Sequence, residues 1–329
     1  MSPIVALASY AATFAIDSES AIRTARHCLI DALARGFEAL DDPERAALIG
    51  PLVPGALMPG GARVPGTSLE LDPAQAAFCN GVMLCRPAGS EHWLALECGH
   101  AADSLGAILS IADYQARKAT MEGQSPPKVR DLLSAAVKAL EIQGVLALEG
   151  GHHHSQTAAI RLARVAATAV VTAQLGGKVG EIAEALSYSC IDGGTATGVD
   201  EERAMGRGEW ATADAISRAV RHACQVMAAA RPSAATSLHP RTLELAARLL
   251  GPGAWKAAQP FGTKVIEQIA ARRSRQDVVE LTSRFQSAVD RRFPARQAER
   301  IKTLFAAPER LIDLPVNEVL AALVANGSR

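Results

Sequence analysis

The sequence has few aromatic residues and no paired cysteine motif, and neither sign of charge is in excess. Phe, Trp and Tyr together make up 4% of its 329 residues, whereas apolar residues make up 49%. The cores of β-sandwiches draw on aromatic and β-branched residues, while Ala and Leu favour close-packed helices. A chain of this length can bury a sizeable core. The composition therefore predicts an all-α fold with little or no β-structure.

The absence of net charge bears on the partners of the protein. Lys and Arg number 34, and Asp and Glu also number 34. Nucleic acids and anionic membranes attract basic surfaces, so we expect neither as a partner. The longest apolar run, near residues 165–175, is too short to span a bilayer. No basic segment followed by an apolar stretch opens the chain. We expect a cytoplasmic protein.

The six cysteines are scattered and form no CxxC pair: Cys28, Cys79, Cys85, Cys98, Cys190 and Cys224. Most have apolar neighbours, which predicts buried, reduced thiols. The sequence also lacks the GxGxxG, Walker, GxSxG, HExxH and EF-hand patterns, each of which would indicate a specific cofactor, metal or nucleophile. We therefore expect no cofactor and no metal.

Apolar residues recur at spacings of three and four, which is typical of amphipathic helices. The predicted helices span residues 19–40, 73–84, 103–118, 126–148, 157–175, 179–190, 210–230, 240–250 and 263–272. Asp17 or Ser18 is expected to cap the first, Asp72 the second, and Gly176 to end the fifth. Shorter helical patterns follow over 276–329. We predict one helical domain, residues 1–272, with C-terminal helices over 273–329 packed on it.

The segment from Arg86 to Asp103 is the strongest candidate for chemistry. It carries two histidines and three carboxylates: His92, His100, Glu91, Glu97 and Asp103. Histidine and carboxylate side chains delivered beside a helix start could perform acid/base catalysis. Asp103 could also cap the following helix, because negative charge is favourable at a helix N-terminus. The alternative is a solvated loop with a capping Asp and a core-facing Trp93.

Two further segments have weaker signals. His152, His153 and His154 could bind a metal, but neighbours on one short loop rarely supply a full ligand set, and a polar turn is the simpler interpretation. The Gly-rich segment 192–209 contains Arg207 and Glu209. Its backbone amides and arginines could hold an anion, although a surface loop explains it equally well.

Several stretches in colinear order resemble one family. They are Ala25–Leu33, Val64–Ser68, Gln75–Gly81, Gly99–Leu109, Ile142–Glu149, Ala166–Val171, Trp210–Val220, Pro260–Lys264 and the tail near 293–323. In these the chain resembles the MmgE/PrpD family, whose members include 2-methylcitrate dehydratases and related lyases and epimerases. The resemblance implies a large helical domain that pairs into homodimers, plus a smaller α+β lid over the active-site cleft. Here the chain enters the lid near 259–272 and then passes to the C-terminal helices, so most of the lid is expected to be absent.

The resemblance also implies which residues would be catalytic. Family members carry an Asp-x-x-Asp-Thr pattern ahead of a Gly-His pair. With His100 on the family histidine, this pattern falls on Ala88, Glu91 and His92. His100 and Asp103 keep their places.

Three other family positions are also changed. A second family histidine falls near Ala159, an expected lysine falls at Gly208, and a basic position in the lid entry falls at Arg272. Groups that act as one catalytic unit lose nearly all of their rate when several are replaced. The departures therefore argue against efficient 2-methylcitrate dehydratase activity.

Two hypotheses follow. The first is a divergent lyase or isomerase that acts by acid/base chemistry on a small carboxylated substrate. Its expected catalytic residues are His100, His92 and Glu91, and its expected substrate-binding residues are Asp103, Arg207, Glu209 and Arg86. The second is a non-catalytic homologue that serves as a dimeric scaffold or partner protein.

Overall fold

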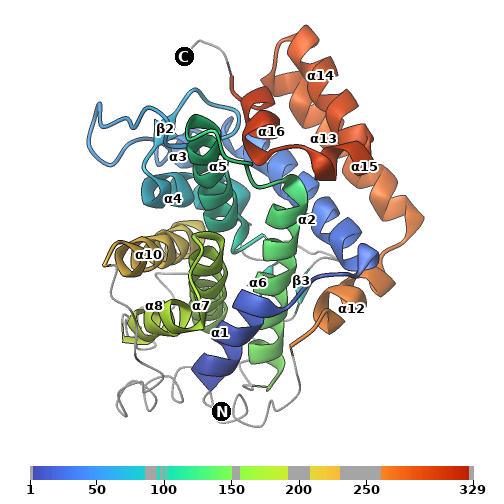
Figure 1. The fold of residues 1–329 in the computed structure, drawn as a ribbon. Helices are drawn as coiled ribbons and strands as arrows, with labels where there is room; N and C mark the ends of the chain where they lie inside the picture. Colours follow the sequence, from blue (N-terminus) through green and yellow to red (C-terminus); the bar gives the residue numbers. More distant parts are fainter. Residues whose placement is uncertain are drawn as a thin grey trace.

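The computed structural model describes residues 3–85, 95–96, 99–100, 102–149, 156–191, 208–229 and 261–325. The described chain is predominantly helical (Figure 1), which confirms the predicted all-α class. In the first half the helices are α1 (Pro3–Thr13), α2 (Glu19–Ala39), α3 (Pro43–Ala46), α4 (Pro73–Leu84), α5 (Leu105–Met121) and α6 (Val129–Glu149). In the second half they are α7 (Gln156–Gln174), α8 (Val179–Ile191), α10 (Gly208–Ala228), α12 (Lys264–Arg272), α13 (Arg275–Arg292), α14 (Ala295–Ala306), α15 (Pro308–Asp313) and α16 (Val316–Ala322).

The predicted helix boundaries rest on local capping that the structure contains. Ser18 caps α2, where its hydroxyl accepts from the backbone N–H of Ala21 at 3.3 Å. Asp72 caps α4, accepting from two backbone N–H groups at 3.0 and 3.1 Å, and Pro73 occupies the first helical position. Gly176 follows α7 with a φ of +88°, a left-handed conformation that glycine adopts without a steric penalty.

Helix α1 is absent from the sequence prediction. Its buried residues, Ile4, Leu7, Ala8 and Ala11, nevertheless follow the helical spacing of three and four. The helix packs against α8 and α7. Its signal was present in the sequence, but the segment lacks the polar face that would have marked it as amphipathic.

Among the residues that the structure describes, strands are confined to two short antiparallel pairs. β1 (Ala62–Arg63) pairs with β2 (Glu70–Leu71), and β3 (Ala95–Leu96) pairs with β4 (Gly99–His100). Each strand has two residues, too few to show the alternation by which strands are recognised in a sequence. The expectation of little β-structure is confirmed, while the pairing itself was not predicted.

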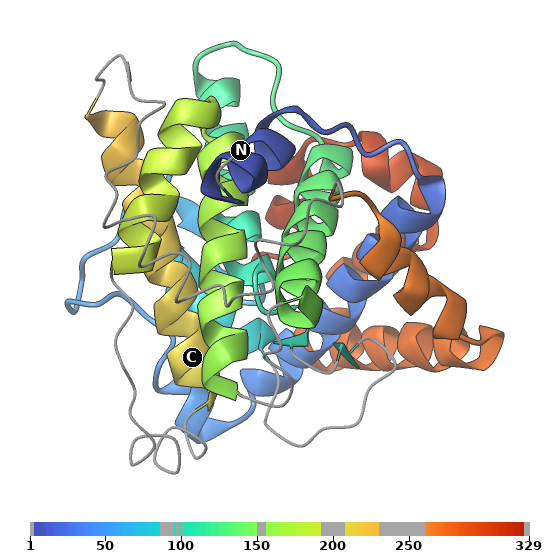
Figure 2. The ribbon, with the colours of Figure 1, turned by 90° about the horizontal axis from the view of Figure 1, so that it is seen from below.

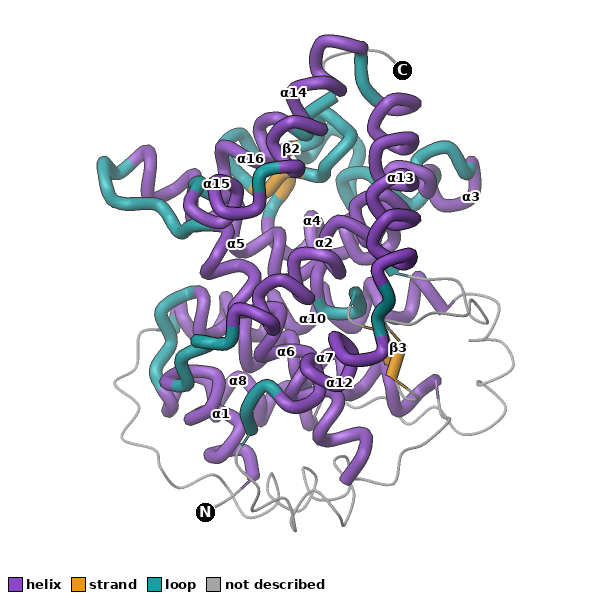
Figure 3. Tube along the Cα trace, turned by 90° about the vertical axis from the view of Figure 1, so that its right-hand side faces the viewer, coloured by secondary structure: helices purple, strands orange, loops and turns teal. Residues whose placement is uncertain are grey.

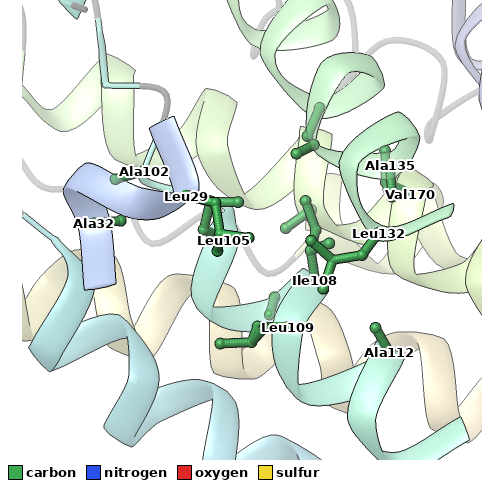
Figure 4. Close-up of a cluster of buried hydrophobic side chains, with 14 of the residues drawn as sticks. Leu29, Ala32, Ala102, Leu105, Ile108, Leu109, Ala112, Leu132, Ala135 and Val170 are labelled. Carbon is green, nitrogen blue, oxygen red and sulfur yellow. The ribbon is translucent and has the colours of Figure 1, made fainter. Parts of the chain in front are cut away.

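The core lies where α2, α5, α6 and α7 meet. Figure 4 shows Leu29 of α2 beside Leu105 of α5, with Ile108 directed towards Leu132 of α6. Val170 of α7 lies on the far side of the same cluster. All five side chains are at most 5% exposed. Burial of this apolar surface is the main contribution to the stability of the fold.

Helices α4, α5 and α10 cross at two glycines. A Cβ atom added at Gly81 would lie 2.8 Å from the Cα atom of Ala213, and one added at Gly106 would lie 2.7 Å from the backbone nitrogen of Gly81. Both distances are shorter than real Cβ contacts allow. Helix α10 also runs beside α7 (Figure 2).

Replacing Gly106 with alanine is expected to destabilise the protein by about 1–3 kcal/mol, because the added methyl meets backbone atoms that can move only if a helix moves. The measurement is urea unfolding followed by circular dichroism. Gly123, which has open space around its Cβ position but a φ of +69°, is unsuitable as a control. Gly50→Ala, with nothing within 4 Å of the new methyl, is the matched control and should change stability little. A loss for Gly106→Ala no greater than that of Gly50→Ala would contradict the packing argument.

A buried ion pair fixes β1 to the helices around it. Arg63 donates from Nε and Nη2 to the two carboxylate oxygens of Asp113 on α5, at 3.1 and 2.8 Å. The Asp113 side chain is 0% exposed and that of Arg63 is 10% exposed. Arg63 also donates to the carbonyl oxygen of Asn317 on α16 at 2.9 Å. One arginine therefore joins three elements that are distant in the sequence.

Helices α14 to α16 lie at one end of the molecule, and α1, α7, α8 and α12 lie at the other (Figure 3). Helix α13 packs along α2, where Glu38 forms ion pairs with Arg284 and, at 3.2 Å, with Arg291. The rings of Phe37 and Phe293 meet edge to face with centroids 5.2 Å apart. Within the described part of the chain, no helix is both long and apolar enough to cross a membrane.

Candidate active site

Residues of several helices approach the start of α5. Gln143 of α6 reaches Asp103, and the Ser104 hydroxyl donates to the carbonyl oxygen of Ala163 on α7 at 3.4 Å. Helix α4 packs against α10, where the rings of Phe78 and Trp210 meet edge to face with centroids 6.3 Å apart. In the sequence, the three segments singled out above, 86–103, 150–155 and 192–209, precede or enter α5, α7 and α10 respectively.

Asp103 is buried at this junction and is 8% exposed. Its Oδ2 atom accepts from the backbone N–H of His100 at 2.9 Å and from the side-chain amide of Gln143 at 3.1 Å. Helix α5 begins one residue beyond Ser104, which occupies the N-cap position without a side-chain hydrogen bond. The suggestion that Asp103 caps this helix was therefore wrong, because its carboxylate is bonded to His100 and to α6 instead.

His100 is half-buried and is held by its backbone on both sides. Its N–H donates to Asp103, and its carbonyl oxygen accepts from the N–H of Asp103 at 3.0 Å. It also pairs with Ala95 across the short β3–β4 ladder. A backbone fixed in this way limits where the imidazole can lie, which is what a positioned acid or base requires.

The other predicted site residues are not placed. Arg86, Glu91, His92 and Arg207 lie outside the described residues, as does the His152–His154 cluster. Glu209 falls within α10, but only its backbone is described. The structure therefore locates two of the seven predicted side chains, His100 and Asp103, and joins the carboxylate of Asp103 to the backbone of His100.

A buried polar layer lies behind this junction, between α7 and α8. The hydroxyls of Thr168 and Ser189 are 2.6 Å apart, and Arg164 is 6% exposed. Burial raises the pKa of the neighbouring Cys190 thiol to about 12, although the charge of Arg164 opposes the rise. Cys190 is consequently a neutral thiol near pH 7 and a poor nucleophile.

The remaining described cysteines have a similar character. Cys28, Cys79 and Cys85 are buried, Cys224 is half-buried, and all of them carry free thiols. Burial raises the pKa of Cys28 to about 12 and that of Cys79 to about 11. The predicted burial is confirmed for Cys28, Cys79, Cys85 and Cys190 but not for Cys224. Among the residues that the structure describes, no three His, Cys, Asp or Glu side chains gather as a metal site would need.

Two polar residues of α6, Gln143 and Glu141, were not singled out from the sequence. Gln143 gave no signal, because its partner lies forty residues away. Glu141 stands between apolar residues on a helix, which is itself a signal of a buried charge. Its carboxylate is fully buried and accepts from the backbone N–H of Ile266 at 2.9 Å, at the start of α12. Burial raises the pKa of Glu141 to about 7, although hydrogen bonds from Ile266 and Val265 oppose the rise.

The raised pKa of Glu141 predicts a stability that depends on pH. Between its ordinary pKa of 4.5 and about 7, the folded protein keeps a proton that the unfolded chain has lost. The free energy of unfolding therefore falls as pH rises through this window, by on the order of 2–3 kcal/mol. Glu141→Gln should remove that fall, as measured by urea unfolding at pH 5 and pH 8. The exposed Glu122→Gln is the control, and an unchanged pH dependence in Glu141→Gln would refute the assignment.

Comparison with known proteins covers the same part of the chain. Residues 5–237 match the MmgE/PrpD N-terminal domain, a range that includes His100, Asp103 and Gln143. The 2-methylcitrate dehydratase of Salmonella typhimurium is 43% identical over 219 residues, which are 66% of this chain and 45% of that protein. That of Cupriavidus necator is 40% identical over 269 residues, 81% of this chain and 55% of that protein.

A relative of lower identity matches a similar share of the chain. The mitochondrial 2-methylcitrate dehydratase of Yarrowia lipolytica is 38% identical over 268 residues, 80% of this chain and 51% of that protein. The chain thus spans about half the length of the curated relatives that it matches.

Proposed function

The chain belongs to the MmgE/PrpD family, and from this premise we propose that it is a divergent lyase or isomerase that acts by acid/base chemistry on a small carboxylated substrate. The single observation that carries the proposal is the fixed backbone of His100, held by the buried Asp103 in the part of the chain that matches the family. The relatives named above are 2-methylcitrate dehydratases, which supports a dehydratase-like reaction.

The proposed chemistry is the loss of water from a hydroxy acid. A base removes the proton from the carbon next to a carboxylate, the electron pair of that C–H bond forms the new C=C bond, and the C–O bond breaks. The departing hydroxide takes up a proton and leaves as water. The reaction needs one positioned base, one acid and cations that stabilise the negative charge developing on the carboxylate.

Each role has a proposed residue in this chain. His100 is the proposed base, with Glu91 and His92 as its partners in proton transfer. Arg86 and Arg207 are proposed to hold the substrate carboxylates, since guanidinium groups bind them bidentately. Asp103 and Glu209 complete the proposed set. The carboxylate of Asp103 accepts from the backbone N–H of His100, which supports a positioning role for Asp103 beside the predicted contact with substrate.

The reaction is proposed to be slow with 2-methylcitrate. The family pattern is replaced by Ala88, Glu91 and His92, and the expected lysine by Gly208. Loss of most of a lid would admit water to the cleft and weaken each electrostatic contact with the substrate. A site that acts as a unit tolerates such changes poorly. The retention of titratable groups at two of the three replaced positions favours a remodelled reaction over simple loss of catalysis.

The remaining predictions on organisation accompany this proposal. We propose residues 1–272 as the family-type helical domain and 273–329 as C-terminal helices on the same domain. We propose a homodimer that resides in the cytoplasm.

A panel of hydroxy and unsaturated acids tests the proposed function. The purified chain is incubated with 2-methylcitrate, citrate, cis-aconitate and related small acids, and products are followed by chromatography and by the absorbance of the new double bond. We expect turnover of at least one carboxylated substrate, with 2-methylcitrate a poor one. Turnover of none of them by a folded dimer would favour the non-catalytic scaffold, and rapid turnover of 2-methylcitrate would refute the proposed divergence.

A further inference from the structure

A cavity of about 240 Å³ lies between α2, α13 and α14, and neither His100 nor Asp103 lines it. Apolar side chains form most of its wall: Ile30, Val278, Leu281, Phe285, Phe305, Ala306 and Pro308. Polar side chains form the rest: Arg26, His27, Thr282, Gln286 and Lys302. Since one water molecule takes up roughly 30 Å³ of liquid, the volume suits a small organic molecule better than a single ion.

The polar end of this cavity is built around His27, which is 5% exposed. Its Nε2 atom lies 3.1 Å from Nη2 of Arg26, and its Nδ1 atom lies against Nη1 of Arg273. Burial, together with the charges of Arg273 and Arg26, lowers the pKa of His27 to about 3. The ring is therefore neutral near pH 7 and carries one N–H group.

A neutral imidazole can accept a hydrogen bond at one ring nitrogen only. Here a guanidinium donor faces each of the two nitrogens. At one of these contacts the N–H of the ring must face another donor, which is unfavourable unless an acceptor lies nearby. A negatively charged oxygen in the cavity would supply that acceptor and would lower the repulsion between the two guanidinium groups.

The Arg26 guanidinium is the group best placed to hold an anion. Besides its contact with His27, it donates to the carbonyl oxygen of Phe305 over a long distance of 3.4 Å. It forms no ion pair with any described residue. Burial and the charge of Arg273 lower the pKa of Arg26, while the charge of Glu309 acts against them.

The other cation of the cavity is already paired. The ammonium of Lys302 lies 2.8 Å from Asp290 and 2.6 Å from Glu299. The anion would therefore be recognised by Arg26 and would leave Lys302 with its two carboxylates.

From these contacts we infer that the cavity binds a small organic carboxylate with a short apolar tail. The carboxylate accepts from the N–H groups of Arg26, where the planar guanidinium offers two parallel donors. The tail packs against Leu281, Phe285 and Phe305, and its burial adds favourable apolar contact. His100 and Asp103 are not among the residues that line this cavity, so the inference does not rest on the proposed function.

Calorimetric titration of the full chain with benzoate tests the inference. We expect saturable binding of one benzoate per chain. Benzamide, which has the same ring without the charge, and inorganic phosphate, which has charge without an apolar tail, should each bind at least about tenfold more weakly. Arg26→Gln should weaken benzoate binding by about tenfold or more. Arg23→Gln, an exposed change of the same charge on the same helix, should leave the affinity within about twofold.

Two further variants keep the outcome clear. Thr282→Trp narrows the cavity from the exposed side of α13 and should weaken benzoate binding even if Arg26→Gln folds poorly, with circular dichroism as the check on folding. His100→Ala should leave the benzoate affinity unchanged, which separates this cavity from the candidate active site. The inference is overturned by an absence of saturable binding, by equal binding of benzamide or phosphate, or by full affinity in folded Arg26→Gln and Thr282→Trp.

Discussion

Replacing His100 with alanine is expected to lower kcat/KM for the best substrate of the acid panel by about 10²- to 10⁴-fold. This is the range that general acid or base catalysis by one side chain contributes. This corresponds to a loss of roughly 3–5 kcal/mol of transition-state stabilisation. The substitution removes the imidazole but keeps the backbone N–H and carbonyl oxygen of His100, and these two groups make its hydrogen bonds to Asp103. The fold should therefore persist, and the loss should appear in kcat.

The measurement is steady-state kinetics on the best substrate of the panel, with thermal unfolding of each variant as the control for folding. Asp103→Asn keeps an oxygen that can accept from His100 and from Gln143, whereas Asp103→Ala keeps none. If Asp103 positions His100, the Asn variant should retain much more activity than the Ala variant. If His100→Ala keeps more than about a tenth of the wild-type kcat/KM, the assignment of His100 as a catalytic residue fails.

The largest loss of stability is expected for Asp113→Ala, at about 3–5 kcal/mol. The variant leaves the Arg63 guanidinium buried without its carboxylate, and an uncompensated buried charge is far more costly than a lost surface pair. It also frees β1, since the backbone N–H of Arg63 donates to the same carboxylate at 2.9 Å. Urea unfolding should show a lower midpoint with little change in slope.

A double variant distinguishes the cost of a lone charge from the value of the ion pair. Arg63→Met combined with Asp113→Leu removes both charges and should recover much of the stability that Asp113→Ala loses, because a well-packed apolar pair often replaces a buried ion pair at little cost. Glu122→Gln removes the exposed partner of Lys118 and is the matched control, with an expected change below about 1 kcal/mol. A loss of less than about 1 kcal/mol for Asp113→Ala would contradict the argument.

Local signals in the sequence predicted the helices, while the contacts of the candidate site depended on distant residues. Ser18, Asp72 and Gly176 act within a few residues of a helix end, so their roles could be inferred from neighbours alone. Asp103 looked like a capping residue for the same reason. Its actual partner, Gln143, approaches only when α6 packs beside α5, and no short-range pattern encodes that approach.

The family resemblance singled out the segment 86–103, and the structure describes the contacts of two of its predicted site residues, His100 and Asp103. His100 was selected because it aligns with a family histidine, and the structure adds the contacts by which Asp103 holds it. The cavity beside α2 had no sequence signal, because Arg26, Leu281 and Phe305 come from three separate helices. Glu141 was the exception, since a lone carboxylate within an apolar helical stretch could have been recognised.

The pairing of α2 with α13 has a consequence for the chain while it is being made. The ion pair between Glu38 and Arg284 joins residues 246 positions apart. At about 5–20 residues per second on a ribosome, roughly 12–50 s separate the synthesis of the two helices. During that interval the face of α2 that carries Phe37 lacks the ring of Phe293 that later covers it. The nascent chain therefore presents apolar surface for long enough to meet chaperones or other nascent chains, and its yield on expression should depend on temperature and chaperone supply.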